Sequence, residues 1–263
     1  MSRQENVIVT GAGSGIGKAF TRLFLADGAH VLAVSLLPEE LDRLRDEMAD
    51  VGGTLVTHVQ DLSAPGAAEA LLAHCDAQGW QVDTLVNNAG FATFGDVVDT
   101  DLMRIETMLR LNVITVTALS SLFGARMRER GSGTILNVGS TAGMVPAVRF
   151  AAYGGTKAYV NAFTVALREE MRPNGVNVTC LAPGPVQTKF AETAKIDSFD
   201  GTSMLKKWFA SGRGSTAEDV ARAGYDGMRE GKAMVLAGTG SGLAALAQHL
   251  IPQSLLPRLM KNM

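Results

Sequence analysis

The chain has 263 residues, of which 46% are hydrophobic and 19% charged, and its 24 Lys and Arg nearly balance its 26 Asp and Glu, for a formal net charge of −2. This composition excludes intrinsic disorder for the bulk of the chain and a nucleic-acid binder that works by bulk electrostatic attraction. Glycine is in excess: its 29 residues make up about 11% of the chain, whereas about 7% is usual.

The cysteine and histidine patterns bear on compartment and metal binding. Cys75 and Cys180 stand far apart and no Cys-x-x-Cys pair occurs, so we expect a reduced, cytoplasmic protein without a disulfide framework. The four histidines show no His-x-x-x-His or His-Glu-x-x-His spacing, so no metal site is expected. The polar N-terminus has no secretory pattern, and no apolar run reaches the ~18 residues of a membrane span.

Apolar runs that predict strands alternate with helical patterns along the chain. The expected strands cover 7–9, 31–34, 55–59, 82–86, 134–138, 176–181 and 234–236. The expected helices cover about 16–28, 38–48, 65–72, 102–130 and 151–171. The strands are continuous apolar runs, which is typical of a parallel sheet covered on both faces. We predict one α/β domain over 1–263, Rossmann-type and doubly wound, with about seven parallel strands and helices on both faces.

Two segments depart from this alternation. Between 184 and 215, apolar side chains such as Phe190 and Trp208 are scattered among Gly and Ser. An insertion after a sheet strand is where α/β proteins place substrate lids, so we expect a lid here; the alternative is a helical hairpin that serves only the core. The apolar segment 243–263 is expected to pack on a second subunit or the core, with peripheral membrane contact as the alternative.

The first expected strand ends in a glycine-rich loop, Thr10-Gly11-Ala12-Gly13-Ser14-Gly15-Ile16-Gly17, and a helix follows. In such a unit, backbone N–H groups and the helix N-terminus face an anion, and glycine lets a pyrophosphate approach closely. The loop does not fit Gly-x-Gly-x-x-Gly, because Ile16 and Lys18 occupy the third-glycine positions, and it does not fit the P-loop. The spacing present, Thr-Gly-x-x-x-Gly-x-Gly, favours a dinucleotide site.

Further motifs follow this loop in order. They are Asp61-Leu62, Asn87-Asn88-Ala89-Gly90, Asn112, Ser140 with Tyr153-Gly154-Gly155-Thr156-Lys157, and Pro183-Gly184 with Thr188. Together with the loop they cover about 7–236 and resemble the short-chain dehydrogenase/reductase family, in its compact single-domain branch. The resemblance implies an oxidoreductase that interconverts a ketone or aldehyde and an alcohol. It also implies a homotetramer or homodimer built on 102–130 and 151–171.

The resemblance assigns residues to a nicotinamide dinucleotide. Asp61 and Leu62 should flank the adenine, and Thr188 should reach the nicotinamide carboxamide. The full expected set is Gly11, Ser14, Gly15, Ile16, Gly17, Ser35, Leu36, Asp61, Leu62, Asn88, Ala89, Gly90, Tyr153, Lys157, Pro183, Gly184, Val186 and Thr188.

The expected catalytic residues are Asn112, Ser140, Tyr153 and Lys157. Tyr153 and Lys157 stand one helical turn apart, so their side chains should share one face of a helix. A phenol has a pKa of about 10, which a nearby ammonium and a positively charged nicotinamide should lower. Tyr153 is then the expected general acid and base, and Ser140 should hydrogen-bond the substrate oxygen. By the family resemblance, Asn112 holds a water that links Lys157 to solvent, and Lys157 grips the nicotinamide ribose.

The end of the second expected strand bears on the choice of cofactor. An acidic residue there binds the ribose 2′-hydroxyl of NAD, whereas Arg or Lys accepts the 2′-phosphate of NADP. This chain has Ser35-Leu36-Leu37, which fits neither pattern. Glu39 or Glu40 could reach the ribose, but Pro38 is expected to turn both into the next helix. Because nothing acidic repels a 2′-phosphate and the motifs look like those of bacterial reductases that mostly favour NADPH, NADP(H) is favoured and NAD(H) remains an alternative.

The expected substrate contacts are apolar: Met144, Val145, Phe150, Phe190 and Trp208, with Phe91 and Phe94 nearby. They favour a hydrophobic ketone or secondary alcohol, and the compound itself stays open. One rival function is a dinucleotide-sensing regulatory protein that lost turnover, against which the intact catalytic set counts. A second is an extended-branch epimerase or dehydratase, which requires Thr-Gly-x-x-Gly-x-x-Gly and a longer C-terminal domain.

Overall fold

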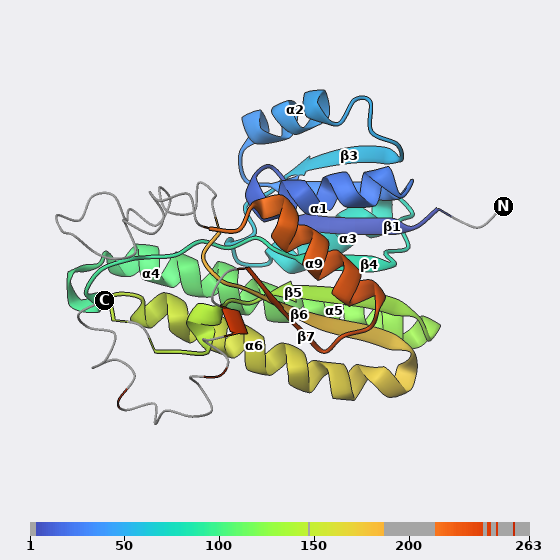
Figure 1. Ribbon diagram of the computed structural model, residues 1–263. Coiled ribbons are helices and arrows are strands. Elements are labelled where there is room, and N and C mark those ends of the chain that lie inside the picture. Colours follow the sequence, from blue (N-terminus) through green and yellow to red (C-terminus); the bar gives the residue numbers. More distant parts are fainter. Residues whose placement is uncertain are drawn as a thin grey trace.

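The computed structural model describes residues 4–146, 148–186, 214–238, 241, 242, 246 and 255. Its centre is a seven-stranded parallel sheet with the order β3-β2-β1-β4-β5-β6-β7 (Figure 1). The strands are β1 (Asn6–Thr10), β2 (His30–Ser35), β3 (Thr54–Val59), β4 (Thr84–Asn87), β5 (Gly133–Val138), β6 (Val176–Pro183) and β7 (Met234–Ala237). The predicted doubly wound α/β fold is confirmed.

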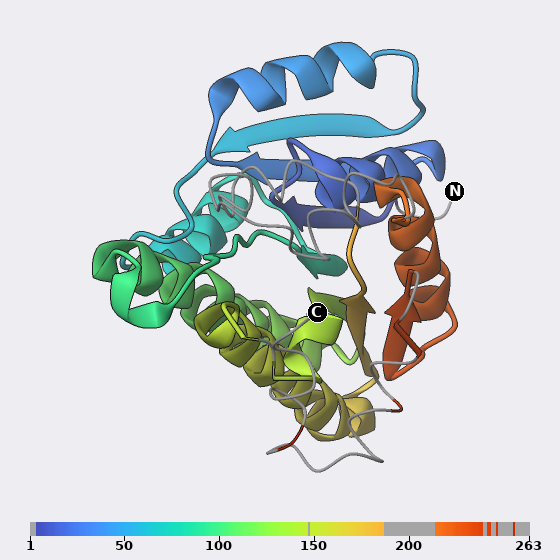
Figure 2. The ribbon, with the colours of Figure 1, turned by 60° about the vertical axis from the view of Figure 1, so that its left-hand side comes forward.

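Helices cover both faces of the sheet. The longer ones are α1 (Gly15–Ala26), α2 (Pro38–Glu47), α3 (Ala67–Ala77), α4 (Leu102–Leu109), α5 (Val116–Arg130), α6 (Ala151–Met171) and α9 (Ala217–Arg229). One apolar core lies between the sheet and α1, α2 and α9, and a second lies between the sheet and α3, α5 and the end of α6. Figure 2 shows α9 (orange) and the α5–α6 pair on opposite sides of the sheet.

The strands are continuous apolar runs because they supply both cores. In β1, Val7 and Val9 belong to the core under α1, whereas Ile8 belongs to the core under α3. All three side chains are fully buried. Alternation of side chains across a strand therefore sends apolar groups to both faces, as expected for a parallel sheet under two layers of helices.

The long helix predicted over 102–130 is interrupted. Between α4 and α5 the backbone forms a π-helical segment, Arg110–Thr115. The whole stretch Leu102–Arg130 is apolar and long enough, by length and composition, to cross a membrane. Here Leu119, Phe123 and Met127 of α5 pack into the core beneath the sheet.

The strand order reverses at β1, which pairs with β2 on one side and with β4 on the other. This reversal sets the position of the site. In open parallel sheets, ligands bind beyond the carboxyl ends of the strands at such a switch point. The segments that follow β1, β2, β4, β5 and β6 all leave the sheet at that edge, and they carry the predicted motifs.

Candidate active site

The glycine-rich loop leaves β1 and enters α1 with its backbone exposed to a ligand. Gly11 and Gly15 adopt left-handed backbone angles, with φ of 63° and 52°, which strongly favour glycine. A Cβ on Gly17 would lie 2.1 Å from the carbonyl oxygen of Gly11, so helix and loop approach too closely for a side chain. Ser14 caps α1 without a side-chain hydrogen bond, and the first turn has no acidic residue. This N-terminus suits the diphosphate of a dinucleotide.

Asn88, which follows β4, holds that loop in place. Its Nδ2 donates to the carbonyl oxygens of Thr10 and Gly11 at 2.9 and 3.2 Å. The backbone N–H groups of Asn88 and Ala89 both donate to Thr10 Oγ1 at 3.0 Å. Asn88 therefore supports the cofactor loop through the loop's own backbone.

Tyr153 and Lys157 lie on one face of α6, as predicted, and both are buried, at 7% and 6% exposure. Lys157 Nζ donates to the carbonyl oxygen of Val138 at 2.7 Å and lies 5.9 Å from the centre of the Tyr153 ring. A Cβ on Gly90 would lie 3.7 Å from the same Nζ. Lys157 thus sits between the ends of β4 and β5.

Ser140 joins Tyr153 across the same edge. It follows β5 and caps the 3₁₀ turn Thr141–Gly143, its Oγ accepting the N–H of Ala142 at 3.0 Å. A hydrogen bond between the Ser140 and Tyr153 side chains favours the phenolate and acts to lower the pKa of Tyr153. The two hydroxyls that the expected mechanism uses are therefore neighbours.

Burial shifts both titratable groups of the pair. It raises the pKa of Tyr153 to about 12, against the smaller effect of Ser140, and lowers the pKa of Lys157 to about 8. The expected lowering of the Tyr153 pKa by Lys157 is therefore wrong for the chain alone. The reason is desolvation, because the phenol packs in an apolar cluster with Phe94, Phe150 and other side chains.

Asn112 lies in the π-helical segment and is completely buried. Its Oδ1 accepts the N–H of Phe91 at 3.2 Å, and its Nδ2 donates to Phe91 O at 2.9 Å and to Thr156 Oγ1 at 3.1 Å. Both amide hydrogens are thus used within the protein. The side chain ties the loop after β4 to the helix turn that carries Lys157. For a water it retains one lone pair on Oδ1.

A carboxylate stands at the end of β2, where the sequence analysis left the cofactor preference open. Glu40 Oε2 accepts a hydrogen bond from the buried Ser35 Oγ at 3.0 Å. A Cβ on Gly13 would lie 2.6 Å from Glu40 Oε2. Pro38 starts α2 and both Glu39 and Glu40 lie in that helix, as predicted, yet the carboxylate of Glu40 still reaches back to the end of β2. A Glu at the third helical position can reach back toward the chain before the helix, and this signal was available in the sequence.

The remaining expected cofactor residues differ in their exposure to solvent and in their hydrogen bonds. Asp61 is exposed and accepts two hydrogen bonds from Ser63, and Leu62 is buried in the core under α3. Leu36 is 58% exposed. Pro183 ends β6, and the N–H of Gly184 donates to Ala237 O at 2.8 Å. Thr188 lies outside the described residues.

Apolar side chains surround Tyr153. The Phe150 ring lies 5.7 Å from the Tyr153 ring and 4.9 Å from the Phe94 ring, and Met108 joins this cluster. Met144 and Val145 are buried in the loop that follows Ser140. Phe190 and Trp208 lie outside the described residues.

The two ends of the predicted lid are described, although 187–213 are not. Val186 and Ser215 form a parallel bridge, so these two residues, which flank the segment, lie side by side. The lid itself stays a prediction.

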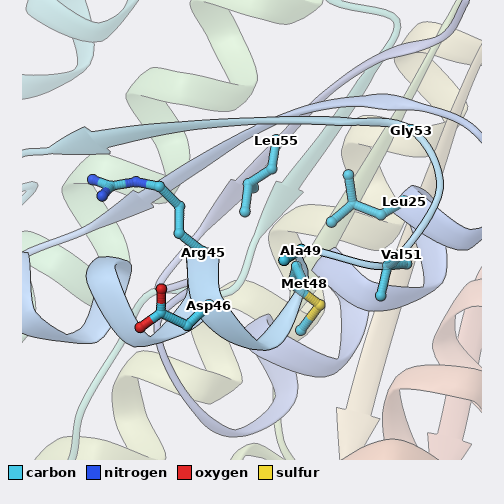
Figure 3. Close-up of a pocket in the computed structure, with 8 residues that line it drawn as sticks. All are labelled: Leu25, Arg45, Asp46, Met48, Ala49, Val51, Gly53 and Leu55. Atoms are coloured by element: carbon cyan, nitrogen blue, oxygen red, sulfur yellow. The ribbon is translucent and has the colours of Figure 1, made fainter.

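A surface pocket lies elsewhere on the molecule, between α1, α2 and β3 (Figure 3). Its lining includes Leu25, Met48, Val51 and Leu55, with Arg45 and Asp46 from the end of α2. Gly53 and Leu55 flank the start of β3, so this pocket lies at the amino edge of the sheet. It has no part in the candidate active site.

The buried ammonium of Lys157 leads to a prediction about stability. Burial lowers its pKa from 10.5 to about 8, so the folded protein binds this proton less readily than the unfolded chain does. Stability is therefore highest above pH 10.5, falls as the pH drops from 10.5 to about 8, and stays at the lower level below that. At pH 7 this costs roughly 3 kcal/mol, offset by about 1 kcal/mol for its hydrogen bond to Val138. We expect Lys157→Met to raise the Tm of the cofactor-free protein at pH 7 by a few degrees, and by less at pH 10.

Calorimetry at both pH values checks this prediction. Lys18→Met, at a partly exposed lysine paired with Glu47, is the control and should not raise the Tm at either pH. A lower Tm for Lys157→Met than for the wild type at pH 7 would contradict the expected cost of the buried charge.

Known proteins resemble this chain in sequence and in fold. A family model described as short chain dehydrogenase matches residues 5–198. The NADP-dependent 3-hydroxy acid dehydrogenase YdfG of Escherichia coli O157:H7 is 34% identical over 218 residues, which cover 82% of this chain and 86% of that protein. A closed form of serine dehydrogenase complexed with NADP+ is 34% identical, with TM-score 0.74 over 84% of this chain and 87% of that chain. A 7β-hydroxysteroid dehydrogenase shares the fold at TM-score 0.83 and 24% identity, over 98% of this chain and 96% of that one.

Proposed function

The chain belongs to the short-chain dehydrogenase/reductase family, and on that premise we propose that it is an NADP(H)-dependent oxidoreductase that interconverts an apolar carbonyl compound and its alcohol. One observation carries the proposal: Tyr153, Ser140 and Lys157 meet at the edge of the sheet where the glycine loop presents its backbone.

In the proposed reduction, Tyr153 is the acid. A phenol with a pKa of about 12 is protonated at neutral pH, so it can give its proton to the carbonyl oxygen as that oxygen gains charge. Ser140 donates a hydrogen bond to the same oxygen. Bound NADPH supplies the hydride. Lys157, with a pKa of about 8, carries a proton at pH 7 and can stabilise the phenolate that Tyr153 leaves.

The preference for NADP(H) rests on the end of β2 and on the relatives. The exposed Leu36 puts no carboxylate directly after the strand. The YdfG relative is described as NADP-dependent, and the serine dehydrogenase was solved with NADP+. Glu40 works against this preference, because its carboxylate lies beside Ser35 and Gly13, near the expected place of the adenosine ribose.

Replacing Glu40 with Gln should therefore strengthen the preference. The change removes a negative charge and keeps the shape of the side chain, so we expect the Kd of NADPH to fall about tenfold and that of NADH to change less than about threefold. Cofactor fluorescence titrations measure both constants. Glu39→Gln, an equal change of charge on the exposed neighbouring residue, should leave both constants within about twofold. Equal effects of the two substitutions would refute the role of Glu40, and tighter binding of NADH than NADPH to the wild type would refute the NADP(H) preference.

The proposed substrate class follows from the apolar surroundings of Tyr153. Phe94 and Phe150 pack beside Tyr153 and would favour a hydrophobic ketone or secondary alcohol there. The relatives described above include proteins named for 3-hydroxy acids and for serine, so acids belong in the test beside apolar compounds. The lid over 184–215 would complete the substrate site.

A panel of carbonyl compounds and alcohols, assayed with each cofactor, tests the function directly. Turnover of apolar ketones with NADPH supports the proposal, and turnover of hydroxy acids alone would refute the apolar substrate class. If nothing in the panel is turned over while NADPH still binds, the result favours the alternative, a dinucleotide-sensing regulatory protein.

We further propose a single-domain, cytoplasmic homodimer or homotetramer. Exposed apolar side chains lie on the two segments expected to form the interface: Leu102, Met103 and Ile114 on one, and Tyr159 and Val165 on the other. Light scattering after gel filtration distinguishes these oligomers from a monomer.

A further inference from the structure

The carboxamide of Asn161 brackets the backbone of Ser140. Its Oδ1 accepts the N–H of Ser140 at 3.3 Å, and its Nδ2 donates to the carbonyl oxygen of Ser140 at 3.0 Å. The thiol of Cys180 in β6 donates to the same Oδ1 at 3.5 Å. Asn161 is 7% exposed, and its two contacts with Ser140 fix the residue on both sides of its Cα.

Asn161 belongs to the same stripe of α6 as the proposed catalytic pair. It lies one turn after Lys157 and two turns after Tyr153, on the buried face of the helix. The helix that carries the acid therefore also holds the backbone of Ser140. This arrangement sets the position of the serine relative to Tyr153 through one rigid element.

The loop before and after Ser140 is shaped to allow this contact. A Cβ on Gly139 would lie 2.0 Å from Asn161 Oδ1. A Cβ on Gly143 would lie 2.4 Å from backbone atoms of Lys157 and Ala158. Glycine at both positions lets the loop lie directly on α6, and at 139 it leaves the space that the Asn161 carboxamide occupies.

We propose that Asn161 is a positioning residue for Ser140: by holding the serine's N–H and C=O, it aims the Ser140 hydroxyl at the oxygen of the substrate. This inference rests on the proposed function, in which Ser140 hydrogen-bonds that oxygen. Sites of this kind need their donors placed within about 0.5 Å, so loosening the backbone of Ser140 should cost turnover without touching the cofactor site.

The test is a double-mutant cycle with Ser140. Asn161→Leu keeps the branching at Cγ and removes both hydrogen bonds, and we expect kcat to fall about 10- to 100-fold while the Kd of NADPH stays within about threefold. In a Ser140→Ala background the same change should cost less than about threefold, because the hydroxyl that it positions is gone. An equal loss of kcat in both backgrounds would overturn the proposal.

The matched control is Thr164→Val, one turn further along the buried face of α6. Thr164 Oγ1 accepts a hydrogen bond from Asn137 Nδ2 at 3.1 Å and donates to Val160 O. These bonds are buried on the same helix, and neither involves Ser140. We expect this variant to lose stability with kcat within about threefold of the wild type. A loss of kcat as large as that of Asn161→Leu would assign the effect to general loosening of α6, against the proposal.

A second measurement keeps the inference separate from the proposed function. Hydrogen–deuterium exchange of the cofactor-free protein, read in a peptide that covers 138–145, should be faster in Asn161→Leu than in the wild type or Thr164→Val. Unchanged exchange in that peptide would overturn the role of Asn161. Absence of turnover in the wild type would instead overturn the proposed function, with the exchange result still standing.

If Asn161→Leu does not fold, Gly139→Ala reaches the same contact from the other side. Its Cβ would displace the Asn161 carboxamide, so we expect the same loss of kcat and the same faster exchange around Ser140. Wild-type kcat and exchange in a folded Gly139→Ala variant would overturn the proposal.

Discussion

Replacing Tyr153 with Phe is expected to lower kcat about 10³-fold while the Kd of NADPH stays within about threefold. Phe keeps the ring, and with it the packing against Phe150 at 5.7 Å and the position 5.9 Å from Lys157 Nζ. The lost hydroxyl is the group that hydrogen-bonds Ser140 and would give its proton to the substrate oxygen. Because the site is buried, bulk water does not readily replace that proton donor.

The matched control is Tyr159→Phe, on the same helix. Tyr159 is half-exposed, and its hydroxyl hydrogen-bonds Thr117 rather than a proposed catalytic group. We expect kcat of this variant within about twofold of the wild type. Steady-state rates at saturating NADPH, with fluorescence titration of the cofactor, separate chemistry from binding. If the Tyr153→Phe variant turns over substrate at the wild-type rate, the proposed mechanism is wrong.

Ser140→Ala has the second-largest expected effect, a loss of about 10²- to 10³-fold in kcat. The reason is electrostatic, because the hydroxyl donates to an oxygen that gains charge only in the transition state. The same variant loses the cap on the turn Thr141–Gly143, where Ser140 Oγ accepts the N–H of Ala142 at 3.0 Å. We therefore also expect a loss of about 1 kcal/mol in the free energy of unfolding.

Two further variants separate these effects of Ser140. Ser140→Thr keeps a hydroxyl and should recover a large part of kcat. Thr216→Ala removes a comparable cap from α9, where Thr216 Oγ1 accepts the N–H of Asp219 at 3.0 Å, and should lower stability without changing kcat. If Ser140→Ala retains kcat within threefold of the wild type, Ser140 is only a cap.

The sheet was predictable because local patterns decide it. Val7-Ile8-Val9 and the apolar runs of the other central strands are buried on both faces, and the glycine loop has one compatible place, between the first strand and the first helix. The shared face of Tyr153 and Lys157 follows from their spacing alone.

What the sequence did not predict depends on contacts between distant segments. The direction of the Tyr153 pKa shift is set by desolvation among side chains from three segments, which an i, i+4 spacing does not reveal. The π-helical break at Arg110–Thr115 leaves no clear mark in an apolar helical pattern. Asn161 could have been suspected from its place two turns after Tyr153, but its contact with Ser140 exists only because the loop lies directly on α6.

Transfer of a labelled hydride tests the central claim most directly. The protein would be incubated with an apolar ketone and NADPH that carries deuterium on the transferring face of C4, and the product analysed by mass spectrometry. The account predicts an alcohol with one deuterium on the carbinol carbon, formed by the wild type and far more slowly by Tyr153→Phe. An alcohol without the label, or no alcohol from any ketone or aldehyde tried, would contradict it.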